Sequence, residues 1–137
     1  MFEVKIIERI PSVAEFISLR TAVGWRIPGH AAAEKGINNS LFMVCAELRE
    51  EVVGCGRIIG DGGFVYYIQD IIVLPKYQGK GIGAKIMDRI VDYLKKQCVE
   101  GTIICLMAAK GKENFYKKYG FIERPNDKYG AGMIKLL

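Results

Sequence analysis

The stretch "YQGKGIGAKIM" (Tyr77–Met87) places three glycines within five residues at the start of a run with helical spacing. The preceding "FVYYIQDIIVL" (64–74) has the β-branched and aromatic content of a strand, which Pro75 ends. A helix that follows at once has first backbone N–H groups without partners inside the helix. The helix dipole adds partial positive charge there, and glycines keep side chains away from the backbone. The stretch therefore predicts a phosphate or pyrophosphate site, with Lys80 as a nearby cation.

Two known nucleotide-binding motifs are alternatives for these glycines, and neither fits the surrounding sequence. Gly79, Gly81 and Ala84 satisfy the dinucleotide pattern G-x-G-x-x-A, but that site needs an acidic residue after the next strand, where Ala108 and Ala109 stand. The sequence contains no G-x-x-x-x-G-K-[ST] phosphate loop. A nucleotide-binding oxidoreductase is therefore a distant alternative, and a glycine-rich turn without a ligand stays open.

The rest of the chain predicts strands around this helix. Apolar stretches bounded by turn residues predict strands over residues 2–8, 41–48, 52–60, 64–74, 101–107 and 131–137. Helical spacing predicts helices over residues 12–23, 82–96 and 112–120, the first opened by a Ser12–Glu15 capping box, with one or two further turns within 24–39. The strand–helix–strand order makes 101–107 parallel to 64–74. The expected fold is α/β (α+β), with a mixed, mostly antiparallel central sheet flanked by helices.

Length and composition restrict the class of protein. The 137 residues suit one domain spanning 1–137, and no apolar run approaches the ~18 residues of a membrane span. The charged start "MFEVKIIERIP" does not resemble a signal peptide, so we predict a cytoplasmic protein without membrane contact. The cysteines form no C-x-x-C pair and are predicted to be buried free thiols: Cys45, Cys55, Cys98 and Cys105. The net charge of +5 favours an anionic partner in general, and a small anionic molecule suits it. The lysines and arginines are scattered without a long basic block, so a nucleic-acid partner is unsupported and none is predicted.

Two motifs carry a resemblance to a known family. "QGKGIG" (78–83) fits Q/R-x-x-G-x-G/A, preceded by "DIIVLPKY" (70–77) and followed by "NFYKKYGF" (114–121). With both motifs in this order, the chain resembles the Gcn5-related N-acetyltransferase (GNAT) family over its whole length. The resemblance implies a GNAT-like fold in which the parallel strand pair separates to form the cofactor cleft.

The resemblance also implies acetyl-CoA as the co-substrate and no metal. The pyrophosphate of acetyl-CoA would bind at Gln78, Gly79, Lys80, Gly81, Ile82, Gly83 and Ala84. The preceding strand typically carries a bulge, and its backbone at Ile71, Ile72 and Val73 would pair with the pantetheine arm. The N–H of Val73 would also polarise the thioester carbonyl. Asn114 would contact the pantetheine side.

Two residues are candidates for proton transfer. Tyr116 occupies the place where the family commonly keeps a tyrosine beside the CoA sulfur, and a phenol with a pKa near 10 can protonate a leaving thiolate. The alternative is that Tyr116 only packs. Asp70 shares the strand alternation of Phe64, Tyr66, Ile68 and Ile72, and is a candidate base if partly buried. A structural hydrogen-bonding role for Asp70 is the alternative, and a bulge would shift this alternation.

The resemblance implies an N-acetyltransferase that passes acetyl directly to a primary amine of a small molecule or peptide in a ternary complex. The rival is a non-catalytic acyl-CoA-binding or sensing module. A homodimer stays open. The acceptor side would be lined by Trp25, Arg26, His30, Asn38, Asn39 and Arg57, although His30 needs no function beyond capping or surface exposure.

Overall fold

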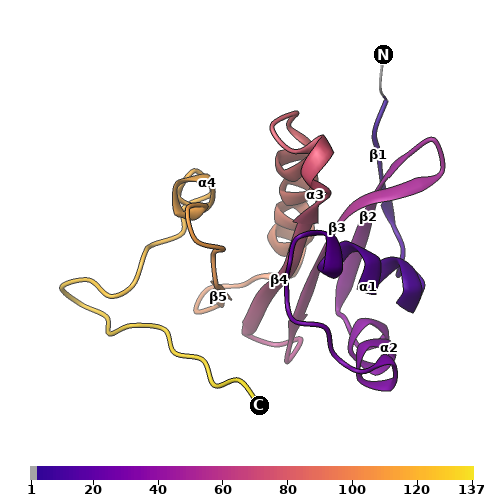
Figure 1. Ribbon diagram of the computed structural model, residues 1–137. Helices are drawn as coiled ribbons and strands as arrows, with labels where there is room; N and C mark the ends of the chain where they lie inside the picture. Colours follow the sequence, from indigo (N-terminus) through magenta and orange to yellow (C-terminus); the bar gives the residue numbers. More distant parts are fainter. Residues whose placement is uncertain (1–2) are drawn as a thin grey trace. The chain divides into compact units, whose positions relative to one another are not determined.

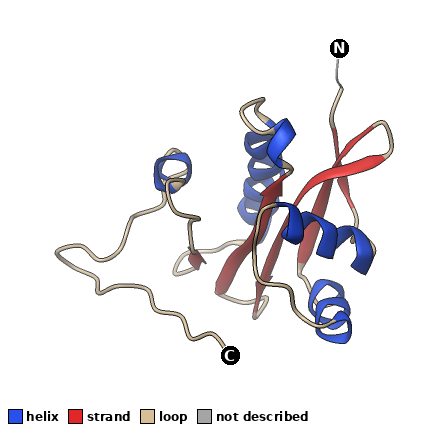
Figure 2. Ribbon diagram, viewed as in Figure 1, coloured by secondary structure: helices blue, strands red, loops and turns tan. Residues whose placement is uncertain are grey.

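The computed structural model of the protein describes residues 3–137. The chain divides into two compact units, the first ending at Cys105 and the second running from Leu106 to Leu137. The first unit contains a sheet with helices on both faces (Figures 1 and 2), and the second contains one short helix. The single domain over residues 1–137 stays a prediction. Among the described residues, no helix has the length and apolar character to cross a membrane.

Five strands form one sheet in the order β1-β2-β3-β4-β5. Strands β1 to β4 pair antiparallel, and β5 lies parallel to β4. The N–H of Ile103 donates to the carbonyl of Phe64 at 2.7 Å where β5 begins. The mixed, mostly antiparallel sheet is thereby confirmed. The strands are β1 Lys5–Glu8, β2 Phe42–Leu48, β3 Glu51–Gly60, β4 Val65–Val73 and β5 Ile103–Leu106.

The helices agree with most of the predicted positions. At the start of α1 the Ser12 hydroxyl accepts from the N–H of Glu15 at 3.1 Å, and the Glu15 carboxylate accepts from the N–H of Ser12 at 2.8 Å. The predicted capping box is therefore confirmed. The helices are α1 Val13–Ala22, α2 His30–Asn38, the 3-10 helix η1 Pro75–Tyr77, α3 Ile82–Gln97 and α4 Glu113–Lys117.

The two faces of the sheet are covered by different helices. Cys55 and Ile72 lie opposite each other and pack in the core cluster that includes residues of α1 and α2. Gly56, the next residue of β3, points to the other face, where a Cβ would lie 2.7 Å from Ile86 and 2.9 Å from Ile90 of α3. Glycine at this position allows α3 to approach the sheet closely.

Strand β4 contains a bulge. Residues 69–72 of β4 lie opposite residues 55–57 of β3, so Asp70 and Ile71 together face Gly56. Asp70 has φ 57°, in the left-handed region that non-glycine residues seldom occupy. The bulge that the family resemblance implies for this strand is therefore present.

The bulge alters which residues share a face with Asp70. The simple alternation places Asp70 with both Ile68 and Ile72. In the structure Asp70 contacts Arg20 of α1, on the face of Ile72, whereas Ile68 lies opposite Ile58 on the face of α3. The expectation is right for Ile72 and wrong for Ile68, because the extra residue reverses the alternation between them.

The chain ends differ from prediction. Residues 131–137 form no strand, and Met133 and Leu137 there are 88% and 101% exposed. An apolar stretch forms a strand only where another strand supplies backbone partners. In the first strand, only Lys5–Glu8 is regular, and Phe2 lies outside the described residues.

Helix α2 is nine residues long and exceeds the predicted one or two turns, because buried Ala33 and Ile37 add packing to its propensity.

The turn between β2 and β3 supports a stability prediction. Leu48 lies opposite Glu51, so Arg49 and Glu50 form a two-residue turn, with φ values of 51° and 68°. Both values are typical of a type I′ turn, which favours glycine. We expect Glu50→Gly to raise the free energy of unfolding by about 1 kcal/mol in urea titrations, because it removes left-handed strain. Glu51→Gly, within β3, is the control and should lower it. An unchanged free energy of unfolding in Glu50→Gly would contradict left-handed strain at this position.

Candidate functional site

The glycine loop links the end of β4 to α3. After η1, Gly79 and Gly81 have φ values of 77° and 84°, and α3 begins at Ile82. Side-chain-bearing residues pay about 1–2 kcal/mol in this conformation, so the glycines are required by the backbone. No described heavy atom lies within 4 Å of a Cβ built at either position. The space in front of this backbone is therefore open.

The start of α3 has the properties of an anion site. Gly81 is its N-cap and has no side chain that could accept from the first amides of this 16-residue helix. Residues 78–81 are exposed, whereas the side chain of Ile82 is buried in the core. The backbone is thus anchored from behind and accessible in front, as anion binding to backbone N–H groups requires.

Gln78 ties the loop to the last residue of β4. Its Nε2 donates to the carbonyl of Val73 at 2.9 Å. The next N–H, of Leu74, donates to Val53 of β3 at 2.8 Å. Because successive residues of a strand direct their N–H groups to opposite edges, the N–H of Val73 points away from β3. The structure therefore brings Ile71–Val73 and the glycine loop together at the end of β4.

Asp70 is bound on both carboxylate oxygens. Arg20 Nη1 donates to Oδ1 at 2.5 Å and Arg57 Nε donates to Oδ2 at 2.7 Å. Gln69 Nε2 lies 3.4 Å from Oδ1, and the Asp70 side chain is 1% exposed. The carboxylate is thus paired with two guanidinium groups and shielded from solvent. The geometry therefore favours the structural role of Asp70 over the role of base.

Sequence reasoning missed Arg20. A buried carboxylate needs a cationic partner, so the predicted burial of Asp70 indicates that an arginine or lysine should be near. Which of the 20 lysines and arginines supplies it depends on how α1 packs on the sheet.

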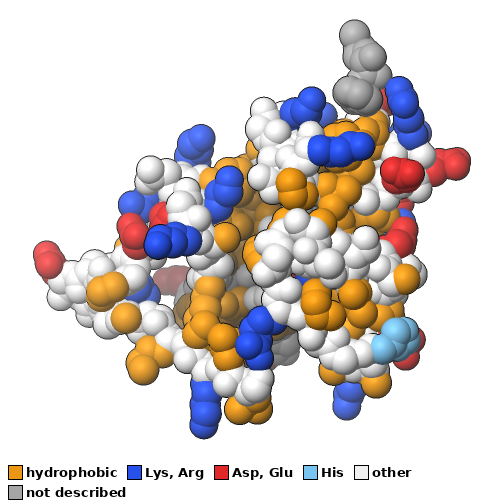
Figure 3. Space-filling model, in the orientation of Figure 1, with side chains coloured by type: hydrophobic (Ala, Val, Ile, Leu, Met, Phe, Trp, Pro, Cys, Tyr) orange, Lys and Arg blue, Asp and Glu red, His pale blue; other side chains and the backbone are white. Residues whose placement is uncertain are grey.

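The residues predicted to line the acceptor side differ in their exposure to solvent. Trp25 is half-buried with its ring 5.6 Å from the Arg20 guanidinium, and Arg57 donates to Asp70 and to the carbonyl of Gly36. The other four are exposed: Arg26, His30 (pale blue in Figure 3), Asn38 and Asn39.

The second unit holds Asn114 and Tyr116 on α4. Asn114 is exposed, and Tyr116 is half-buried with its ring 5.0 Å from Phe115 and 6.3 Å from Phe121. Burial raises the pKa of Tyr116 to about 12, so its hydroxyl stays protonated at neutral pH. Phe115 and Phe121 beside it are also half-buried.

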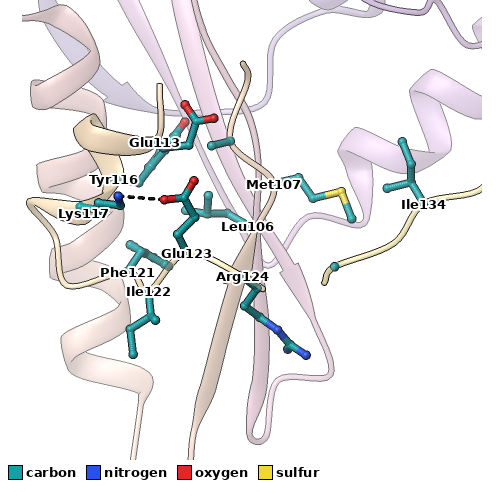
Figure 4. Close-up of a pocket in the computed structure, with 12 residues that line it drawn as sticks. Leu106, Met107, Glu113, Tyr116, Lys117, Phe121, Ile122, Glu123, Arg124 and Ile134 are labelled. Atoms are coloured by element: carbon teal, nitrogen blue, oxygen red, sulfur yellow. Dashed lines mark ion pairs between the residues drawn. The ribbon is translucent and has the colours of Figure 1, made fainter. Parts of the chain in front are cut away.

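A cavity of about 390 Å³ adjoins Tyr116 within this unit (Figure 4). Leu106, Phe121 and Ile134 supply apolar walls, and an ion pair of 2.8 Å between Lys117 and Glu123 lies at its edge. Tyr116 thus lines a hollow whose walls are both apolar and charged.

The four cysteines differ in burial. All four are free thiols, with Cys45 and Cys55 buried as predicted and Cys98 and Cys105 half-buried. Burial raises the pKa of Cys45 to about 11 and that of Cys55 well above its ordinary value, so both stay protonated and are poor nucleophiles. Within residues 3–137, no three His, Cys, Asp or Glu side chains group closely enough to hold a metal ion.

Comparisons with known proteins agree with this geometry. The sequence profile of the Acetyltransferase (GNAT) family matches residues 10–121. The crystal structure of a probable acetyltransferase of unknown function from meticillin-resistant Staphylococcus aureus is similar with a TM-score of 0.90, at 37% identity, over 98% of this chain and 100% of that chain. An uncharacterized N-acetyltransferase from Pyropia yezoensis is 28% identical over 82% of this chain, which spans 66% of that relative's length.

A third relative is named for its acceptor. Thialysine N-epsilon-acetyltransferase from Mus musculus is 30% identical over 84% of this chain and 75% of its own length. The family profile covers the bulged strand, the glycine loop, α3 and the helix that carries Tyr116. The chain has a bulged strand that runs through a positive-φ glycine loop into a long helix, and the family profile matches most of its sequence. The chain therefore belongs to the Acetyltransferase (GNAT) family.

Proposed function

We propose that this protein transfers the acetyl group of acetyl-CoA directly to a primary amine in a ternary complex. The observation that carries the proposal is the glycine loop Gln78–Ala84, whose open backbone precedes the amides of α3. Acetyl-CoA use is general to the family. The pyrophosphate would accept from these amides, with Lys80 contributing charge.

The reaction forms a carbon–nitrogen bond and breaks the carbon–sulfur bond, while the amine loses one proton and the leaving sulfur gains one. The amine nitrogen attacks the thioester carbonyl carbon, the carbon–sulfur bond then breaks, and the sulfur leaves as a thiolate. The N–H of Val73, directed away from β3, would stabilise the negative charge on the carbonyl oxygen in the intermediate. Ile71 and Ile72 would pair with the pantetheine arm, and Asn114 would contact it.

Tyr116 is the proposed acid that protonates the thiolate, since its phenol is protonated at neutral pH. Asp70 as the base stays a prediction, and the two arginines on its carboxylate favour the structural alternative. If Asp70 is the base, the pH profile of kcat/KM should have an acidic limb in the wild-type enzyme. That limb should be absent in Asp70→Asn.

The acceptor is proposed to be a primary amine of a small molecule or peptide. The mouse relative is named for a lysine analogue, and the names of relatives otherwise leave the acceptor open. A non-catalytic acyl-CoA-binding module is the rival. Binding of acetyl-CoA without acetylation across a broad amine panel would favour the rival. The cytoplasmic location and the homodimer stay predictions.

Calorimetric titration tests the glycine loop directly. We expect wild-type protein to bind acetyl-CoA and not NAD, and Gly81→Ala to bind acetyl-CoA about tenfold or more weakly, because a Cβ at φ 84° strains the loop by about 1.4 kcal/mol or more. Gly101→Ala is the matched control, with φ 89°, open space and a position outside the loop. Equal affinity of the two variants would contradict the loop as the pyrophosphate site, and no binding by wild type would contradict the proposed function.

A further inference from the structure

Asp70 is the single buried charged residue among those that the structure describes. Its carboxylate joins two elements that are distant in sequence, α1 through Arg20 and β3 through Arg57, whose side chains are 15% and 14% exposed. Burying three charges is expensive, and apolar residues of similar volume often stabilise a core equally well or better. Fold stability alone is therefore a weak explanation for this cluster.

The cluster is centred on the bulge of β4. Asp70 is the bulged residue with φ 57°, and its carbonyl accepts from the thiol of Cys55 at 3.3 Å. The side chain and the carbonyl of Asp70 are thus both held. A bulge fixes the direction of the strand that follows it, which here is Ile71–Val73. The contacts that hold Asp70 therefore also orient the N–H of Val73.

Each arginine also reaches a segment beyond the sheet. Arg20 Nε donates to the carbonyl of Arg26 at 2.8 Å, and its guanidinium lies 5.6 Å from the ring of Trp25, both in the α1–α2 connection. Arg57 Nη1 donates to the carbonyl of Gly36 at 3.2 Å and lies 3.4 Å from the hydroxyl of Ser40. The cluster thereby connects the bulge with both ends of the segment that contains α2.

We propose that Arg20 and Arg57 are positioning residues for the acetyl group. Through Asp70 they hold the bulge of β4 in the conformation that directs the N–H of Val73 toward the thioester carbonyl. The inference rests on the proposed function. It requires the planar, multidentate guanidinium, because one side chain must bind the carboxylate and a neighbouring carbonyl or hydroxyl at fixed angles.

The test uses acetyl-CoA labelled with ¹³C at the carbonyl, which needs no acceptor. Hydrogen bonding polarises the carbonyl, so its ¹³C resonance should move downfield when wild-type protein binds. We expect Arg20→Met and Arg57→Met still to bind acetyl-CoA saturably by calorimetry and to lose most of the downfield shift. We expect kcat with any amine substrate to fall about tenfold, which is part of the loss known for removing one oxyanion donor.

Arg9→Met is the matched control. Arg9 also joins α1 to a strand through two carboxylates, Glu15 at 3.2 Å and Glu47 at 2.6 Å, neither of them in β4. This variant should lose stability and keep the full carbonyl shift. If the methionine variants do not fold, Arg20→Lys and Arg57→Lys, which keep the charge without the fork, are expected to show a reduced shift.

The outcomes separate the two proposals. A full downfield shift in the folded arginine variants, or wild-type binding without a shift, would overturn the positioning role and leave acetyl-CoA binding intact. Absence of acetyl-CoA binding in the wild-type titration would overturn the proposed function itself. Lower thermal stability with an unchanged shift would assign the cluster to fold stability alone.

Discussion

Tyr116→Phe is expected to lower kcat about 10²-fold or more while leaving the Kd for acetyl-CoA unchanged. The substitution removes the hydroxyl that protonates the leaving thiolate and keeps the ring that contacts Phe115 and Phe121. Steady-state kinetics with a primary amine, together with calorimetry, measure the two quantities. Full activity in this variant would show that Tyr116 only packs.

Tyr119→Phe is the control for this effect. Tyr119 lies two residues after the end of α4, and its ring lies 5.6 Å from that of Phe115. The same atom is removed from the same segment, so kcat should stay close to the wild-type value. A comparable loss in both variants would indicate a change in α4 packing in place of lost acid catalysis.

The pH dependence of kcat gives a second check on Tyr116. Burial raises its pKa to about 12, so the phenol is protonated below that value and loses its proton only as the pH rises through it. An acid with this pKa adds no falling limb to the profile between about pH 6 and pH 10. A falling limb in that range that disappears in Tyr116→Phe would mean that the bound enzyme lowers this pKa.

Gly54→Ala is expected to lower the free energy of unfolding by about 2–3 kcal/mol. A Cβ at Gly54 would lie 2.6 Å from the backbone oxygen of Ile72 and 3.3 Å from Ile86 of α3. A backbone oxygen in a paired strand moves only if β4 moves, so the strain is not relieved by a side-chain rotation. Urea unfolding monitored by circular dichroism measures the loss.

Gly36→Ala is the control with the opposite expected sign. Gly36 lies inside α2, and no described heavy atom lies within 4 Å of its Cβ position. Alanine should raise the free energy of unfolding there by about 0.5–1 kcal/mol, since it favours the helix. Equal losses at Gly36 and Gly54 would contradict the close approach of β3 and β4.

Local features of the chain are those that the sequence predicts well. The capping box of α1 depends on residues three positions apart, and the apolar face of α3 on spacings of three and four. Pro75 and the glycines mark the strand-to-helix turn for the same reason, because they act on their own backbone. The failed strand over 131–137 shows the limit of such reasoning, since its apolar residues are present but no described strand pairs with them.

The candidate site likewise has parts that the sequence predicts and parts that only the tertiary structure decides. The sequence by itself determined the glycine loop and the family, because a positive-φ turn before a helix is encoded in consecutive residues. Tertiary structure alone decided that Arg20, 50 positions from Asp70, and Arg57, 13 positions from it, meet at the bulge of β4. Their meeting depends on how α1 packs on the sheet and on one extra residue in a strand ladder, and neither depends on the spacing of residues along the chain.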